Sequence, residues 1–531
     1  MTALHKTLPR ARTPEEVGVS SQKIAEYLRE AEQSGLELHS FMALRHGKVA
    51  VECFREPFSP ERNHDMWSVS KSFTATALGF AIHEGLICMD TRLAELFREY
   101  APKKPDERWG KLTIEHLVTM TAGKSPPYLS PKGPDADWIQ TYIDSPWYND
   151  PGVENRYVNE NFFLLSAALQ RATGTPMMDY LRPRLFEPLG FARPTWETDN
   201  RGVECGSWGF SCKTEDLAKF ILCYLEEGRF EGLQVIPADW AKSAVQKQRD
   251  STGVRESTQN GYGFGFWRNP ERVGGWRANG MFSQFGIAFP EQDAIFVCNA
   301  SVADETVMHD LVWEYIPAAF IDGAQHGEAA TVCFEASPFE PPPSVSPRSP
   351  LEKQIDGRRI HLRRNRLLPP MHFQVTALPV ILTVKNPYLT HQINDITLHF
   401  GEQEAEFYWR EGKDENALPL GLDGSCREGT MRINGQDYTV LGAGEWLNDS
   451  AFQVKLRYIE TISSQSFVFT FHKNKVAMQS KSTPPVAHII AFIAEGAASM
   501  IKNPVALKLV NRVFGMVPKL AEPKHRGKLE R

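Results

Sequence analysis

Apolar and polar positions along the first half of the chain predict strands at both ends and helices between them. Residues 21–34 place apolar side chains at helical spacing, which predicts an amphipathic helix. Residues 40–55 hold two apolar runs joined at His46-Gly47, a pattern typical of a β-hairpin. Residues 67–86 are apolar nearly all round, as in a fully buried helix. Strand-like runs return over residues 262–301, so the pattern favours an antiparallel sheet with a helical insertion.

A proline-rich segment separates this part from a second one with a different pattern. Six of the 16 residues in 335–350 are proline, which removes amide donors and favours extended chain. We therefore predict a first domain over 1–334 and a linker over 335–350. Short alternating segments fill 351–483, where Asn434-Gly435 indicates a hairpin turn, and predict a smaller β-rich domain of meander or barrel type. Residues 484–531 are predicted to form a helical tail.

Composition and charge narrow the classes of partner. The chain has 531 residues, of which 42% are hydrophobic and 23% charged, so it can bury a large core without disulfides or a structural metal. A net charge of −6 gives the chain no excess of positive charge with which to bind nucleic acid. The N-terminus has no apolar signal region, and the most apolar tract, 486–501, is shorter than the roughly 20 residues of a membrane span. We expect a cytoplasmic protein with no nucleic-acid partner and no membrane span.

Cysteine and histidine positions predict neither a disulfide framework nor a metal site. The eight cysteines are scattered and never form C-x-x-C, so we expect isolated buried thiols in a reducing compartment. The fifteen histidines show no ligand spacing. The lipase elbow G-x-S-x-G and the phosphate-binding G-x-x-x-x-G-K-[ST] are also absent. The sequence therefore predicts no metal and no organic cofactor.

Residues 68–71, SVSK, form an S-x-x-K motif at the start of the predicted buried helix. Three residues span nearly one helical turn, so the Ser68 hydroxyl and the Lys71 amine share one face. A neutral lysine amine beside a serine can accept its proton, and a helix N-terminus favours the developing negative charge. Two further copies of the motif, Ser20 to Lys23 and Ser499 to Lys502, are interpreted as accidental.

Two later segments could complete a site around this motif. Residues 157–159, YVN, are the only Y-x-N in the chain. The tyrosine could relay a proton to a leaving group, and the asparagine could hold the lysine or a substrate carbonyl. In the strand-like segment 278–280, ANG, Gly280 would let a substrate approach the backbone, and the Met281 amide could pair with that of Ser68 as an oxyanion hole. A helix-capping asparagine beside a core tyrosine, and a glycine at a strand bulge, are the structural alternatives.

In this order the three motifs resemble those of the serine β-lactamase and penicillin-recognising superfamily. The resemblance is to its class C-like branch of family VIII esterases, D-amino-acid amidases and nylon-oligomer hydrolases, and spans about residues 13–320. It implies an α+β fold, with an antiparallel sheet flanked by helices and an all-helical subdomain. It also implies that Ser68 is the nucleophile, that Lys71 and Tyr157 share the acid–base work, and that Asn159 is a positioning residue. Whether Lys71 or Tyr157 is the base stays open.

One departure from the family pattern bears on the substrate. The third motif often carries Lys or His where this chain has Ala278, and the resemblance implies that this cation helps to hold the substrate carboxylate in penicillin and cell-wall peptide recognition. Arg277 is adjacent, but successive strand side chains point to opposite faces, so it cannot simply replace the cation. The departure argues against strong β-lactamase or DD-peptidase activity. Gly280 and Gln284 together resemble the nylon-hydrolase-like branch.

The sequence thus predicts a serine hydrolase that cleaves a small ester or amide through an acyl-enzyme on Ser68. Two alternatives stay open. One is a peptidase for D-amino-acid or cell-wall-type substrates, or a weak β-lactamase, and the other is a catalytically silent member that binds a ligand. The β-rich C-terminal region could shape the cleft, bind a ligand or mediate homo-oligomerisation.

Overall fold

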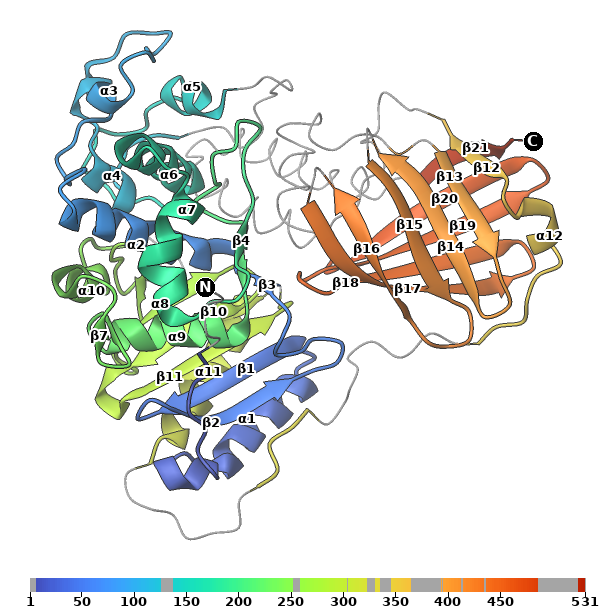
Figure 1. The fold of residues 1–531 in the computed structure, drawn as a ribbon, viewed down its shortest axis with the longest axis horizontal. Coiled ribbons are helices and arrows are strands. Elements are labelled where there is room, and N and C mark those ends of the chain that lie inside the picture. Colours follow the sequence, from blue (N-terminus) through green and yellow to red (C-terminus); the bar gives the residue numbers. More distant parts are fainter. Residues whose placement is uncertain are drawn as a thin grey trace, which may run out of the picture. The chain divides into compact units, whose positions relative to one another are not determined.

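The computed structural model in Figure 1 describes most of the chain. The described residues are 6–125, 137–251, 258–302, 304–321, 330–334, 345–363, 393, 395–411, 414–433, 436–485 and 524–530. The chain divides into two compact units, residues 1–130 with 135–339, and residues 131–134 with 340–531.

The first unit is built on a six-stranded antiparallel sheet in the order β2-β1-β11-β10-β9-β8. β1 and β2 form the predicted hairpin, and both residues of its turn, His46 and Gly47, have positive φ angles of 52° and 70°. Such angles match the right-handed twist of the flanking strands. The six strands are β1 (Leu38–Arg45), β2 (Lys48–Phe54), β8 (Trp267–Arg268), β9 (Trp276–Gly280), β10 (Gln284–Phe289) and β11 (Ala294–Ala300).

Helices cover both faces of this sheet (Figure 1). The predicted amphipathic helix is α1 (Ser21–Gln33), which packs with α11 (Glu305–Ala319) in one hydrophobic cluster that includes the odd-numbered residues of β10. On the opposite face lies α9 (Thr214–Leu225). A Cβ at Gly286 of β10 would lie 2.5 Å from Ile221 of α9, so α9 packs directly on the sheet.

A helical region is inserted between β2 and β8. The predicted buried helix begins as a 3₁₀ turn, Trp67–Val69, and continues as α2 (Ser70–His83). Almost every residue of α2 is buried, because helices pack around it and β9 contacts its N-terminal turn. The other helices of this unit are α3 (Leu93–Leu96), α4 (Ile114–Val118), α5 (Trp138–Ile143), α6 (Asn159–Thr173), α7 (Met177–Leu181), α8 (Glu187–Leu189) and α10 (Ala238–Ala244). Short strands join them: β3 (His64–Asp65), β4 (Thr195–Trp196), β5 (Phe210–Cys212), β6 (Arg229–Phe230) and β7 (Leu233–Gln234).

The second unit is a ten-stranded barrel in the order β15-β14-β13-β12-β21-β20-β19-β18-β17-β16. A parallel bridge, Gly421 opposite Ala443, joins β15 at one end of this order to β17, the strand next to the other end. Within its described residues the unit also holds one short helix, α12 (Glu352–Ile355). Its strands are β12 (Arg359–Leu362), β13 (Asp395–Phe400), β14 (Glu404–Glu411), β15 (Asp414–Gly421), β16 (Arg427–Ile433), β17 (Gln436–Asn448), β18 (Ala451–Tyr458), β19 (Ser464–His472), β20 (Lys475–Thr483) and β21 (Lys524–Leu529).

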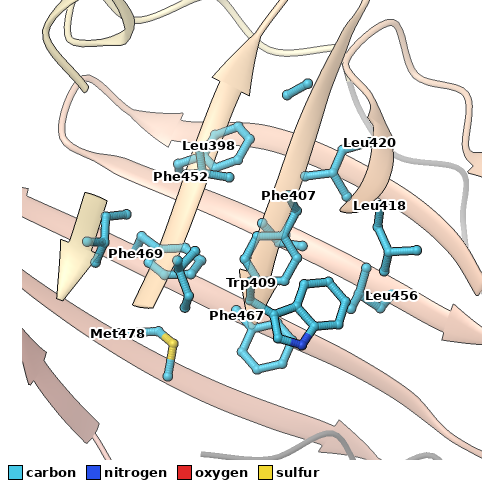
Figure 2. Packing of buried hydrophobic residues seen from close by; sticks show 14 of the residues in the cluster. Leu398, Phe407, Trp409, Leu418, Leu420, Phe452, Leu456, Phe467, Phe469 and Met478 are labelled. Atoms are coloured by element: carbon cyan, nitrogen blue, oxygen red, sulfur yellow. The ribbon is translucent and has the colours of Figure 1, made fainter. Parts of the chain in front are cut away.

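Large side chains fill this second unit (Figure 2). Trp409 is fully buried, with its ring 5.1 Å from that of Phe407, which lies 6.1 Å from Phe467. Alternate residues of β18, β19 and β20 point into this core, as the period-2 pattern predicts. Together the sheet with its helices and the β-rich second unit confirm the predicted fold class.

Two details of the C-terminal prediction need separate mention. Residues 524–529 form β21, which pairs with β12 and β20, so a helix is wrong for this part of the tail. Residues 486–523 of the predicted tail lie outside the described residues, as do Asn434-Gly435. The strands that flank this dipeptide do form a hairpin, with Ile433 opposite Gln436.

All eight cysteines are thiols outside any disulfide, but the expectation of buried thiols holds for only five of them. Cys88, Cys333 and Cys426 are exposed, because they lie in turns or loops at the surface.

Among the described residues, none of the helices combines the length and the apolar character needed to cross a bilayer.

Candidate active site

Ser68 lies in a tight turn between β3 and α2. The residue before it, Trp67, has a φ of +48°, a backbone conformation that costs free energy for a bulky side chain and needs support from its surroundings. Asp65 Oδ1 accepts the Trp67 amide at 3.1 Å. The Ser70 hydroxyl donates to the Trp67 carbonyl at 2.5 Å and accepts the Phe210 amide at 3.1 Å. These bonds hold Ser68 half-buried just before the N-terminus of α2.

The Lys71 amine lies between the other predicted site residues, Ser68, Tyr157 and Asn159. Its Nζ is 3.0 Å from the Ser68 Oγ, 2.7 Å from Oδ1 of Asn159 and 2.9 Å from the main-chain oxygen of Ser207. The side chain is buried, and this burial holds the pKa of Lys71 well below its usual range, although the charge of Glu160 opposes the shift. The amine is therefore uncharged over a wider pH range than an exposed lysine.

Tyr157 reaches the same group from the loop before α6. Lys71 Nζ lies 4.7 Å from the centre of the Tyr157 ring. Burial raises the pKa of Tyr157, and a hydrogen bond with the Ser68 side chain acts in the opposite direction. The Tyr157 ring stacks on Trp267 of β8, with centroids 5.5 Å apart. This phenol therefore stays protonated beside the serine.

The end of β9 runs against the same turn. A Cβ at Gly280 would lie 2.4 Å from the Met66 oxygen and 3.3 Å from the Ser68 nitrogen, so only glycine fits here without displacement. Met281 is half-buried and begins the turn from β9 to β10. Gln284 Nε2 supports this turn by donating to the carbonyl oxygen of Met281 at 3.3 Å and to that of Phe282 at 3.1 Å.

Neighbouring positions on β9 face opposite ways, as the strand pattern predicts. Ala278 is fully buried and lies on the same face of the strand as Gly280. Arg277 lies on the other face, where it donates to Oδ1 of Asn279 at 3.0 Å and to the Arg268 carbonyl at 3.0 Å. Arg277 therefore does not replace the cation that is absent at position 278.

This arrangement agrees with a comparison to known families. The Beta-lactamase family profile matches residues 24–318, which is more than half of the chain. The chain belongs to the β-lactamase family. It is accordingly a β-lactamase-family hydrolase, and the matched range includes all three motifs around Ser68.

Individual relatives of this β-lactamase-family chain carry several activities. The 6-aminohexanoate-dimer hydrolase of Paenarthrobacter ureafaciens is 25% identical over 323 residues, which cover 56% of this chain and 81% of that enzyme. The monacolin J acid methylbutanoyltransferase of Aspergillus terreus is 32% identical over 106 residues, covering 18% of this chain and 25% of the transferase. A solved structure assigned as a 6-aminohexanoate-dimer hydrolase, from Bacillus anthracis, shares the fold with a TM-score of 0.50 and 18% identity, covering 59% of this chain and 87% of that one.

The structure also adds site residues that the motifs did not predict. The Ser207 carbonyl contacts Lys71, and its loop depends on Gly206 and Gly209, whose φ angles are +66° and +82°. The only feature of the sequence that could have indicated this loop is a pair of nearby glycines with Ser207 between them. Asp65 accepts a hydrogen bond from the amide of Trp67 and so holds the turn that leads to Ser68. No spacing of residues in the sequence predicts this contact.

Proposed function

We propose that the protein hydrolyses small carboxylic esters or amides through an acyl-enzyme on Ser68. The surroundings of Lys71 Nζ support this best. A neutral amine has two N–H groups and one lone pair, and the oxygens of Asn159 and Ser207 can only accept hydrogen bonds. Both N–H groups are therefore used, and the lone pair faces the Ser68 hydroxyl at 3.0 Å. This orientation suits Lys71 to the role of general base.

Acylation then follows from the positions of these groups. The Ser68 proton passes to Lys71 as Oγ forms a bond to the substrate carbonyl carbon. The negative charge that develops on the carbonyl oxygen would be stabilised by the amides of Ser68 and Met281 and by the N-terminal end of α2. The absence of a side chain at Gly280 lets β9 pack closely against the turn that carries the Ser68 amide.

Tyr157 is suited to release the leaving group. Its raised pKa keeps the phenol protonated, so it can give its proton to the departing alcohol or amine as the bond to the acyl carbon breaks. The phenolate regains a proton from the Lys71 ammonium, which restores both groups. Water next attacks the acyl carbon while Lys71 accepts its proton, and that proton returns to Ser68 as the acid leaves.

The proposed substrate class rests on Ala278 and on the relatives. Without a cation at position 278, an acyl group that lacks a carboxylate here is favoured over a penicillin or a cell-wall peptide. The hydrolase relative acts on the 6-aminohexanoate dimer and the transferase relative moves a methylbutanoyl group, as their names state, and both names are consistent with a small acyl chain. The peptidase and silent-binder alternatives have no comparable support from the residues around Ser68.

Covalent labelling tests this proposal. Wild-type protein and a Ser68→Ala variant would be treated with a fluorophosphonate and then with a chromogenic acyl ester. We expect one adduct on the wild type by intact mass, on the peptide that contains Ser68, and none on Ser68→Ala. Ser20→Ala is the matched control, because Ser20 belongs to an accidental S-x-x-K whose serine caps α1, and it should label like the wild type. An adduct that persists in Ser68→Ala would refute the assignment.

A further inference from the structure

A chain of buried polar side chains, which the proposed acyl transfer does not use, leads to the Ser68 turn. Glu37 Oε1 lies 2.9 Å from Nε2 of His39, and Nδ1 of His39 lies 2.8 Å from Nε2 of His64. Nδ1 of His64 lies 3.0 Å from the main-chain oxygen of Asp65. The carboxylate of Asp65 accepts the amide of Trp67, the strained residue before the nucleophile. We call Glu37, His39 and His64 the relay.

The fold holds the relay rigidly in place. His39 is fully buried on β1, and the ring of Phe58 stacks on it with centroids 3.9 Å apart. His64 is 4% exposed and lies on β3, opposite Cys212 of β5. Because neither ring has room to turn, each nitrogen keeps the neighbour described above.

These contacts require a definite number of protons. Each of the three contacts needs one hydrogen between its two heavy atoms, so the relay must carry three. A glutamate carboxylate with two neutral imidazoles carries only two. Beside a Glu37 carboxylate, the third proton makes either His39 or His64 an imidazolium, and both arrangements satisfy all three contacts. Without it, two lone pairs face each other at one contact, which costs free energy in a buried site.

We propose that Glu37, His39 and His64 are positioning residues for Ser68, which share one extra proton and so fix the Asp65 backbone and the Trp67 turn. This inference rests on the proposed function, because its readout is the acylation of Ser68. When the extra proton leaves at higher pH, two lone pairs face each other at one of the three contacts, and the support that the relay gives to the Asp65 backbone weakens. Acylation by Ser68 then slows.

Other charged and titratable groups near the relay have to be distinguished from it. Arg55 donates its main-chain N–H to the His39 carbonyl and pairs with Glu32. Burial raises the pKa of Cys212 well above its usual range, and that thiol lies near the Asp216–Lys219 pair. Burial also raises the pKa of Asp65 to about 7. Deprotonation of Asp65 would strengthen its bond to the Trp67 amide, so its effect has the opposite sign.

A Glu37→Gln variant tests the relay. The Gln amide can donate to Nε2 of His39, so neutral imidazoles satisfy all three contacts and no extra proton is needed. We expect Glu37→Gln to acylate within about twofold of the wild type at neutral pH and to lack the wild-type decline at high pH. Glu37→Ala cannot donate, and we expect its acylation rate to fall about 10- to 100-fold with little change in KM, because the nucleophile is misplaced.

The measurement is the burst rate with a chromogenic ester from pH 6 to pH 10. Glu84→Gln is the matched control, since Glu84 bonds Tyr180 and Arg184 away from the relay, and its profile should equal that of the wild type. A Glu37→Gln variant that keeps the wild-type decline, or loses rate as Glu37→Ala does, would overturn the inference, as would a wild type with no decline. Normal fluorophosphonate labelling in those cases would leave the proposed function intact, whereas a wild type that is never labelled would overturn both.

Discussion

Nζ of Lys71 lies 2.7 Å from Oδ1 of Asn159, although the two residues are 88 positions apart in the chain. Asn159 is the first residue of α6, and Lys71 lies in the first turn of α2. An uncharged amide beside a buried amine accepts a hydrogen bond without favouring the charged form as a carboxylate would. The pairing is therefore compatible with a neutral Lys71, whose pKa burial lowers.

An Asn159→Asp variant tests this relationship through the pH dependence of activity. In the wild type the lowered pKa of Lys71 means that the active, neutral amine forms at lower pH than in an exposed lysine. A carboxylate at position 159 would favour the ammonium and raise that pKa, so the acid limb of kcat/KM should move up by about 1–3 pH units. Asn63→Asp, at a site where the amide contacts only the Arg193 carbonyl among the described bonds, should leave the limb in place. An acid limb unmoved in Asn159→Asp would contradict Lys71 as the base.

Tyr157→Phe removes the phenol and keeps the ring that stacks on Trp267. Since general acid help is worth about two to four orders of magnitude, we expect kcat/KM for an ester to fall at least 100-fold with little change in thermal stability. Tyr180→Phe is the control, because that hydroxyl bonds Glu84 outside the site. Activity of Tyr157→Phe within a few-fold of the wild type would remove Tyr157 from the reaction.

Gly280→Ala should abolish acylation, because its Cβ would lie 2.4 Å from the Met66 oxygen beside the Ser68 amide. Gly286→Ala is a stringent control, since its Cβ would also meet a neighbour at 2.5 Å, but on α9. Both variants should lose stability, as measured by thermal unfolding. At a temperature where both remain folded, only Gly280→Ala should resist fluorophosphonate labelling, and equal labelling of the two would argue against an oxyanion site at Gly280.

Trp409→Ala should destabilise the barrel, because it removes a fully buried ring from the core of that unit. We expect a loss of about 3–5 kcal/mol in the free energy of unfolding. Urea unfolding followed by circular dichroism measures it, with the transition of each unit fitted separately, since a two-unit chain need not unfold in one step. Leu447→Ala, at a residue that is 50% exposed, should change stability by less than about 0.5 kcal/mol.

Local patterns along the chain predicted the parts of this protein that depend on near neighbours. Side chains three positions apart along a helix share one face, and Lys71 Nζ does lie within hydrogen-bonding distance of the Ser68 hydroxyl. The same spacing at Ser20 and Lys23 produces only a helix cap, since Ser20 accepts the Lys23 amide there. The hairpin at His46-Gly47 and the alternating strands of the barrel likewise follow from turn chemistry and period-2 burial.

Tertiary structure alone decided how distant segments meet. No pattern near Ser207 indicates that its carbonyl accepts a hydrogen bond from Lys71, and none near residues 524–529 indicates a strand between β12 and β20. The protonation of Lys71 depends in the same way on burial by several helices and loops. Periodicity records which face of an element is buried but not which partner buries it, because many apolar faces are equivalent until the whole chain has packed.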